Sequence, residues 1–127
     1  MSDQFRAIVI NQTENKFTRE VKSLKKSFFK NGDILVDVDY SGLNYKDALI
    51  LNNCGKLVKE YPQIPGIDFS GKVVESENTN FKIGDDVILT GWRVGEIYPG
   101  GYAQFAKVKS EFLVKTPKKL TNKNAMI

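Results

Sequence analysis

The chain has 127 residues, of which 41% are hydrophobic and 27% are charged, and it contains one cysteine and no histidine. These values are typical of one globular domain with a single core, and they exclude a disordered chain. No apolar run approaches the roughly 20 residues that a membrane-spanning helix needs, so no membrane partner is expected. The N-terminus lacks the basic and apolar segments of a signal peptide, which predicts a cytoplasmic protein.

The absence of histidine removes several kinds of catalytic site. A Ser-His-Asp triad and an imidazole-bound zinc ion both need that side chain. Because Cys54 is the single cysteine, an internal disulfide and a four-cysteine zinc site are excluded as well. We therefore predict no metal site, and we expect Cys54 to be an unreactive packing residue.

The net charge is +4, and the excess lysines fall in two groups. The groups are Lys22, Lys25, Lys26 and Lys30, followed by Lys115, Lys118, Lys119 and Lys123. No nucleic-acid-binding module accompanies them, so we predict a solvated basic surface and no nucleic-acid partner. Such a surface can still attract a small molecule that carries phosphate groups.

The first predicted elements are strands. Residues 7–10 are apolar and β-branched, and residues 17–21 follow a polar turn, which together predict a hairpin. After the Asn-Gly-Asp turn at residues 31–33, apolar and polar side chains alternate over residues 34–41. That period of two predicts a half-buried strand.

A short helix is predicted over residues 44–51. Asn44 is a favourable N-cap, and Asp47 stands three positions later, where its carboxylate can complete a capping box. This placement favours a structural role for Asp47. Residues 52–55 end the helix, because asparagine and glycine tolerate the left-handed conformation.

Further short strands and glycine-rich turns fill the rest of the chain. The predicted strands are residues 69–75, 87–89, 102–108 and 112–114. Gly71 indicates a bulge or a close backbone approach, and residues 91–101 form a glycine-rich loop. Several short strands at regular spacing predict a barrel or a sandwich. Thr121 can cap a helix that begins at Asn122, from which we expect the chain to be part of a longer protein.

Five sequence motifs follow one another along the chain. They are Ser-Gly-Leu-Asn-Tyr-Lys-Asp-Ala at 41–48, Ile-Pro-Gly-Ile-Asp-Phe-Ser-Gly at 64–71, Phe-Lys-Ile-Gly-Asp-Asp-Val at 81–87, Leu-Thr-Gly-Trp-Arg-Val-Gly-Glu at 89–96 and Gly-Gly-Tyr-Ala at 100–103. In these motifs the chain resembles the N-terminal catalytic domain of medium-chain dehydrogenase/reductases. It is most similar to their zinc-free branch of quinone oxidoreductases and acrylyl-CoA reductases.

The resemblance implies a mainly β fold over residues 1–120, a GroES-like, partly open β-barrel with short helices. Residues 121–127 would begin the helix that leads into a Rossmann domain. No Gly-x-Gly-x-x-Gly turn occurs in the chain, so NADPH would be bound mainly by that missing domain. The missing domain is therefore an expected partner, and the full protein is compatible with a homodimer.

The activity implied by the resemblance is hydride transfer from NADPH to the C=C bond of an α,β-unsaturated carbonyl compound. The small-molecule substrate would be an acrylyl-CoA-like thioester or a quinone, and no zinc ion would take part. Without the Rossmann domain, the fragment itself is expected to be inactive.

Four residues are candidates for the site. The resemblance places Asn44 and Tyr45 at the cleft between the domains as catalytic residues, with Tyr45 also reaching the nicotinamide end of the cofactor. Trp92 and Arg93 lie in the glycine-rich loop and would contact the substrate, although Arg93 stands where the family is expected to carry a small residue. Asp68 occupies a position that is acidic beside the metal in zinc-containing relatives.

The same residues also have purely structural interpretations. Asn44 serves as a helix cap, Tyr45 packs under the helix and Arg93 is a solvated surface charge. On that view, one alternative function is a stand-alone GroES-like binding module without catalysis. Another is a co-chaperonin-like ring subunit, which would need residues 91–101 as a loop that grips its partner.

Overall fold

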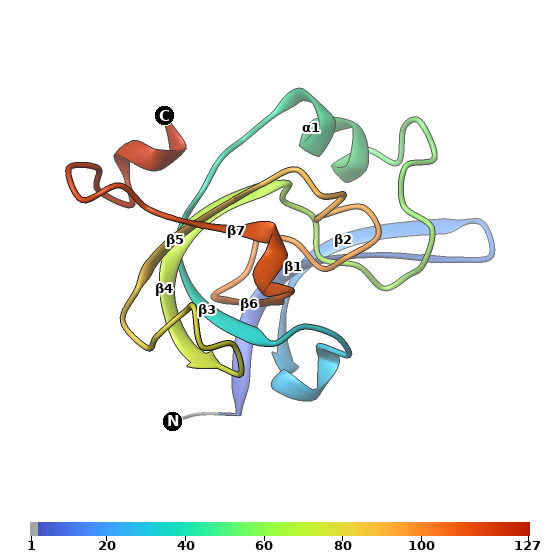
Figure 1. The fold of residues 1–127 in the computed structure, drawn as a ribbon. Helices are drawn as coiled ribbons and strands as arrows, with labels where there is room; N and C mark the ends of the chain where they lie inside the picture. The colour runs from blue at the N-terminus through green and yellow to red at the C-terminus, as the bar shows by residue number, and fades with distance from the viewer. Residues whose placement is uncertain (1–2) are drawn as a thin grey trace.

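The computed structural model describes residues 3–127, and within them it is mainly β, as predicted (Figure 1). The strands are β1 (Gln4–Thr13), β2 (Lys16–Lys25), β3 (Ile34–Ser41), β4 (Asp68–Ser76), β5 (Asp86–Thr90), β6 (Phe105–Val108) and β7 (Leu113–Lys115). The helices are α1 (Tyr45–Leu51) and the short 3-10 helices η1 (Lys26–Phe28), η2 (Ser110–Phe112) and η3 (Asn124–Met126). Within residues 3–127, no helix is both long enough and apolar enough to cross a membrane.

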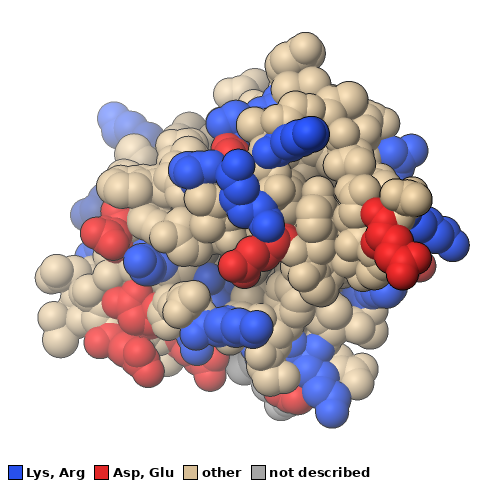
Figure 2. Space-filling model, turned by 90° about the vertical axis from the view of Figure 1, so that its right-hand side faces the viewer, with Lys and Arg blue, Asp and Glu red and all other residues tan. Residues whose placement is uncertain are grey.

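The strands form two antiparallel sheets that curve around the interior as a partly open barrel (Figure 1). One sheet has the order β6-β3-β4-β5-β7, and the other is the hairpin of β1 and β2. The predicted hairpin is confirmed and is longer than expected, since its pairs run from Gln4 with Lys25 to Thr13 with Lys16. Lysine and arginine side chains are spread over the face shown in Figure 2, with carboxylates between them.

The start of β3 is buried on both faces, which differs from the predicted alternation. Ile34 and Val36 belong to the core inside the curved sheet, whereas Leu35 belongs to a second core. That second core also contains Phe5 and Val9 of the hairpin. Because the hairpin covers the outer face of the sheet here, apolar side chains occupy both faces of the strand.

Gly71 lies where β4 approaches β3, so the predicted close backbone contact is confirmed. A Cβ atom at this position would overlap the carbonyl oxygen of Asp37 and would stand 2.9 Å from Val36 Cγ1. The register between the two strands also shifts between Val38 and Tyr40, opposite this glycine. The shift marks the predicted bulge, which lies on the β3 side of the pair.

The helix α1 is confirmed together with its capping box of Asn44 and Asp47. Its end is also as predicted, because Asn53 adopts a φ of 56° and Gly55 a φ of 78°. The expectation for Cys54 is wrong: its side chain is exposed in this turn and does not pack in a core. Cys54 is exposed because the turn that ends α1 lies on the surface of the domain.

One predicted strand is shorter than expected, and another is shifted by one residue. Residues 102–104 precede β6, and their backbone is shared between two strands: Gln104 O still accepts a bond from Val38 N of β3 at 2.9 Å, whereas other groups of the segment bond to β1. Ile8 N donates to Tyr102 O at 2.9 Å, and Gln104 N donates to Arg6 O at 2.9 Å. These bonds join the hairpin to the larger sheet. Phe112 is the last residue of η2, so β7 begins at Leu113.

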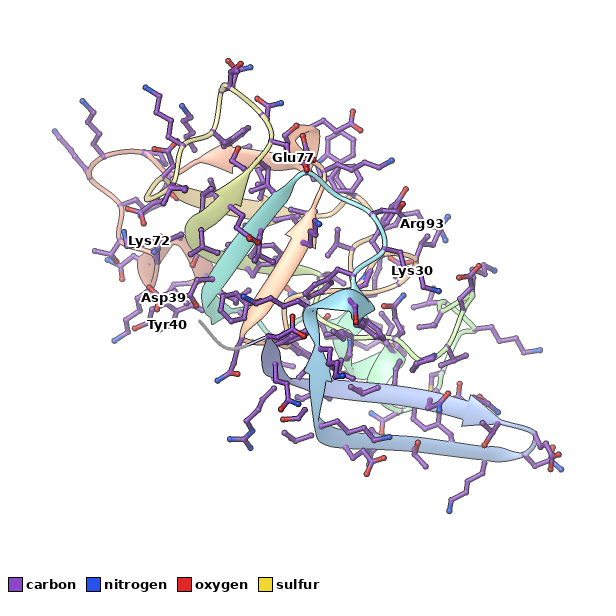
Figure 3. All side chains as sticks on the ribbon, turned by 90° about the horizontal axis from the view of Figure 1, so that it is seen from below. Lys30, Asp39, Tyr40, Lys72, Glu77 and Arg93 are labelled. Carbon is purple, nitrogen blue, oxygen red and sulfur yellow. The ribbon has the colours of Figure 1, made fainter. Side chains whose placement is uncertain are left out.

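The segment after β7 is held against the sheet by Asn122. Ser70 Oγ donates to Asn122 O at 2.6 Å, and Asn122 Nδ2 lies 3.3 Å from Asp39 Oδ2 and 3.2 Å from Asp86 Oδ1. Figure 3 shows Asp39 beside Lys72, whose ammonium pairs with Asp86 at 2.7 Å. The predicted helix start at Asn122 is wrong, because η3 begins at Asn124 with Lys123 at its N-cap. Thr121 Oγ1 still accepts a bond from Asn124 N at 3.1 Å in the turn that leads into η3.

A Gly71→Ala substitution tests the close approach of β3 and β4. The added methyl group must displace the Asp37 carbonyl, so we expect a loss of about 1–3 kcal/mol in the free energy of unfolding. Urea denaturation measures the change. Glu75→Ala, at an exposed position on the same strand, is the control and should stay within about 0.5 kcal/mol of the wild type. Equal stability of the Gly71→Ala variant and the wild type would contradict the contact.

Candidate functional site

The turn that precedes α1 is held by two carboxylates that share one amide. Asn44 Nδ2 donates to Asp47 Oδ2 at 3.1 Å and to Asp68 Oδ2 at 3.0 Å. The backbone N–H of Asn44 donates to the same Asp47 oxygen at 3.0 Å. Both donors of the side-chain amide are therefore engaged, and the turn cannot rotate without breaking bonds to charged acceptors.

Asp47 and Asp68 extend this network to other parts of the chain. Asp47 is fully buried, and its second oxygen accepts a bond from Ile67 N at 2.9 Å. Asp68 Oδ1 accepts a bond from Gly42 N at 3.0 Å. The structural role predicted for Asp47 is confirmed, and it is wider than a cap because it joins α1 to the segment that enters β4.

Tyr102 closes the other side of the turn. Its hydroxyl donates to Gly42 O at 2.9 Å. Burial raises the pKa of Tyr102 above its ordinary value, and the negative charges of Asp47 and Asp68 raise it further. The hydroxyl therefore stays protonated and remains a donor to the turn.

Tyr45 stands on this rigid turn with its side chain in solvent. It is 81% exposed, in contrast to the packing role that its structural interpretation requires. Its neighbour Leu43 is 80% exposed. A phenol and an apolar side chain are thus presented together on a fixed backbone, which is an arrangement suited to contact with another group.

The other two candidates, Trp92 and Arg93, lie in the glycine-rich loop, and their side chains have different surroundings. Gly91, Trp92 and Arg93 all have positive φ, at 78°, 56° and 58°. Trp92 stacks on Phe112 with a centroid distance of 4.9 Å and is 53% exposed. Arg93 turns instead toward Glu96, with 3.7 Å between Nε and Oε2.

Glu96 is a functional candidate that the sequence analysis missed. Its carboxylate is buried and also accepts from Lys46 Nζ at 2.8 Å, so it joins the loop to α1. Two cations thus converge on one buried anion, and one of them, Lys46, directly follows Tyr45 in the chain. No local sequence pattern indicates this, because Lys46 and Glu96 are far apart in sequence and meet only in the fold.

The loop of residues 91–101 is packed against the domain. Val94 is fully buried, and Gln63 Nε2 donates to the carbonyls of Glu96 at 3.2 Å and Ile97 at 3.1 Å. A co-chaperonin-like subunit needs a loop that extends toward its partner. The conformation of this loop gives that alternative no support.

No cluster of three or more acidic or cysteine ligands for a metal ion occurs among residues 3–127. Asp68, at the position that the resemblance associates with a metal, bonds to Gly42 and Asn44. Its oxygens thus have protein donors as partners, which is consistent with a structural carboxylate.

The Tyr102 hydroxyl gives a pH-dependent prediction. Above about pH 10 the unfolded chain loses this proton while the folded chain retains it, so the free energy of unfolding should fall as pH rises. Urea denaturation of the wild type and Tyr102→Phe at several alkaline pH values measures this dependence. The variant should be less stable at neutral pH and should show a shallower alkaline decline. Identical declines would contradict the burial of this phenol.

Comparison with known proteins identifies the family of this domain. The sequence model of the alcohol dehydrogenase GroES-like domain matches residues 30–118. A probable acrylyl-CoA reductase of Escherichia coli K12 is 46% identical over 121 residues, which cover 95% of this chain and 37% of that protein. An acrylyl-CoA reductase of Ruegeria pomeroyi is 44% identical over 124 residues, which cover 96% of this chain and 38% of that protein.

Solved structures agree as well. The yhdH oxidoreductase of Salmonella enterica, in complex with NADP, aligns with a TM-score of 0.92 and 45% identity over 95% of this chain and 37% of its own. Bacillus subtilis yhfP, with NAD bound, aligns with a TM-score of 0.91 and 36% identity over 98% of this chain and 38% of its own. This chain therefore spans less than two fifths of the length of these relatives. It belongs to the family of alcohol dehydrogenase GroES-like domains, within the medium-chain dehydrogenase/reductases.

Proposed function

We propose that this chain is the catalytic domain of an NADPH-dependent enzyme that reduces the C=C bond of an α,β-unsaturated carbonyl compound. The substrate is an acrylyl-CoA-like thioester or a quinone. Support comes from the acrylyl-CoA reductases at 46% and 44% identity and from a putative quinone oxidoreductase of Bacillus subtilis at 37% identity. Because the relatives are longer, the enzyme would include a dinucleotide-binding domain outside these residues.

The observation that carries this proposal is the exposed Tyr45 on a turn held by two carboxylates, of which Asp47 is buried and Asp68 is half-buried. When a hydride adds to the β-carbon of an unsaturated carbonyl compound, negative charge develops on the carbonyl oxygen. A neutral hydroxyl aimed at that oxygen stabilises the charge, provided that its position is fixed in advance. Tyr45 has the hydroxyl, and the bonds of Asn44 to Asp47 and Asp68 fix its backbone.

Asn44 acts in this proposal by positioning Tyr45. Both of its amide donors are used by carboxylates, so the side chain has no hydrogen left for a substrate. Its contribution to catalysis is then the orientation of the turn. Loss of the amide would release Tyr45 and leave two carboxylates without their shared donor.

Trp92 and Arg93 would form the substrate side of the site. The ring of Trp92 rests on Phe112 and keeps part of its surface in solvent for an apolar group. Arg93 uses Nε toward Glu96, which leaves its terminal nitrogens for an anionic group of the substrate. Lys46 shares Glu96 and adds a second cation nearby.

Bound NADPH would supply the hydride. The exposed phenol of Tyr45 fits the polar end of a nicotinamide group, because it can donate to or accept from a carboxamide. These residues offer no dinucleotide-binding turn, so most of the cofactor contacts belong to the proposed further domain. Zinc independence is supported by the shortage of zinc-ligating side chains, since the chain has no histidine and one cysteine.

The activity is tested by following NADPH oxidation by the full-length protein with acryloyl-CoA, crotonyl-CoA and a simple quinone. We expect turnover with at least one of these acceptors, and none with the 127-residue chain alone. Binding of NADPH without turnover on any acceptor would overturn the proposed substrate class. Turnover by the isolated chain would contradict the need for a further domain.

Tyr45→Phe tests the proposed donor. Removal of one preorganised donor to a developing oxyanion lowers turnover about 100- to 1000-fold, so we expect kcat/KM to fall in this range. The control is Tyr40→Phe, which removes the hydroxyl of another exposed tyrosine and should leave kcat/KM unchanged. Wild-type kinetics in Tyr45→Phe would remove this residue from the site.

A further inference from the structure

We propose that a groove outside the Tyr45 site binds a nucleoside phosphate, an anionic group attached to an aromatic base. The groove has a volume of about 520 Å³, which is within the range of small-molecule sites. Its walls come from the end of η1, the connector after α1, the end of β6 and residues 97–99. The inference concerns binding and is independent of the reaction proposed above.

The charge of the groove selects an anion. Four lysines line it, against a single glutamate, Glu60: they are Lys30, Lys59, Lys107 and Lys109. Within residues 3–127, none of these lysines forms an ion pair with a carboxylate. Lys30 extends from the same side of the molecule as Arg93 in Figure 3. Four lysines from separate segments that line one groove without a carboxylate partner favour a ligand with more than one negative charge, such as a phosphate ester.

The rest of the lining selects an aromatic ring. Phe28, Tyr61 and Tyr98 are half-buried side chains of the groove, so each presents part of its ring. The Tyr98 ring packs on Phe112 at a centroid distance of 5.3 Å, and Lys109 Nζ lies 5.6 Å from the Tyr98 centroid. A purine base can stack on such rings while lysines hold its phosphate groups.

The wall of the groove is already formed without a ligand. The Gln63 side chain uses its amide nitrogen on two carbonyls of the loop and its oxygen on Ile64 N at 3.0 Å. Val108 and Phe112, which also line the groove, are buried in the core. Little ordering is therefore required when a ligand enters, which lowers the cost of binding.

The basic residues and aromatic rings also raise single-stranded nucleic acid as an alternative. A strand-binding surface repeats its rings and charges along an open path, whereas these converge in one groove. The groove thus favours a single nucleotide unit. Such a unit has two sources, a free nucleotide or the nucleotide end of a carrier such as coenzyme A.

The test uses the fluorescence of the 127-residue chain, in which Trp92 is the single tryptophan and stacks on the groove residue Phe112. ADP, adenosine 3′,5′-bisphosphate, adenosine, inorganic phosphate and an oligodeoxythymidylate are titrated, and isothermal calorimetry checks each affinity. The variant Lys30→Gln/Lys59→Gln removes two groove charges. Lys118→Gln/Lys119→Gln removes the same charge from exposed positions outside the groove.

We expect at least one of the two adenosine phosphates to bind about tenfold or more tightly than adenosine or inorganic phosphate. The Lys30→Gln/Lys59→Gln variant should lose about tenfold or more in this affinity, and the control should stay within about twofold. Preference for ADP indicates a free nucleotide, and preference for the bisphosphate indicates a carrier. Equal losses in both variants, equal binding of phosphate alone, tighter binding of the oligonucleotide, or no binding at all would overturn the proposal.

Discussion

The candidate site depends on the two hydrogen bonds that the side-chain amide of Asn44 donates to Asp47 and Asp68. Two carboxylates, one of them fully buried, lie within hydrogen-bond distance of the same nitrogen. Bringing two anions together is costly unless donors satisfy them. The donors come from Asn44, Gly42 and Ile67, so the charges hold together the end of β3, the start of α1 and the entry to β4. These hydrogen bonds between carboxylates and donors fix the backbone on which Tyr45 stands.

A second constraint comes from the backbone contacts around the glycines. Gly71 lets β4 pass close to β3, and Gly100 packs on the carbonyls of Pro65 and Gly66. A side chain at Gly71 would force β4, which carries Asp68, away from β3, and a side chain at Gly100 would force the glycine-rich loop away from Pro65 and Gly66. The candidate residues therefore lie on backbone whose spacing is set by close packing, which limits the movement of the loop relative to α1.

Much of the fold could be predicted from the sequence because its signals are local. The capping box of Asn44 and Asp47 is visible at a spacing of three residues, and the hairpin and the bulge at Gly71 also have local signatures. The burial of Leu35 on the outer face of β3 had no such signature, because it depends on a hairpin that packs there from elsewhere in the chain. The same limit applies to Glu96, whose partner Lys46 lies in a distant segment, and to the lysines that meet in the groove.

The position of β2 has a consequence for association between copies of the chain. Within the described residues this strand pairs only with β1, so its outer edge presents backbone donors and acceptors to solvent. Exposed edges of this kind can pair with other strands and begin aggregation. The strand carries positive charges at Lys16, Arg19, Lys22 and Lys25 against one carboxylate, Glu20, which pairs with Lys22 at 3.1 Å and leaves an excess of positive charge. Edge-to-edge contact would bring these charges together, and their mutual repulsion protects the hairpin from unwanted sheet extension.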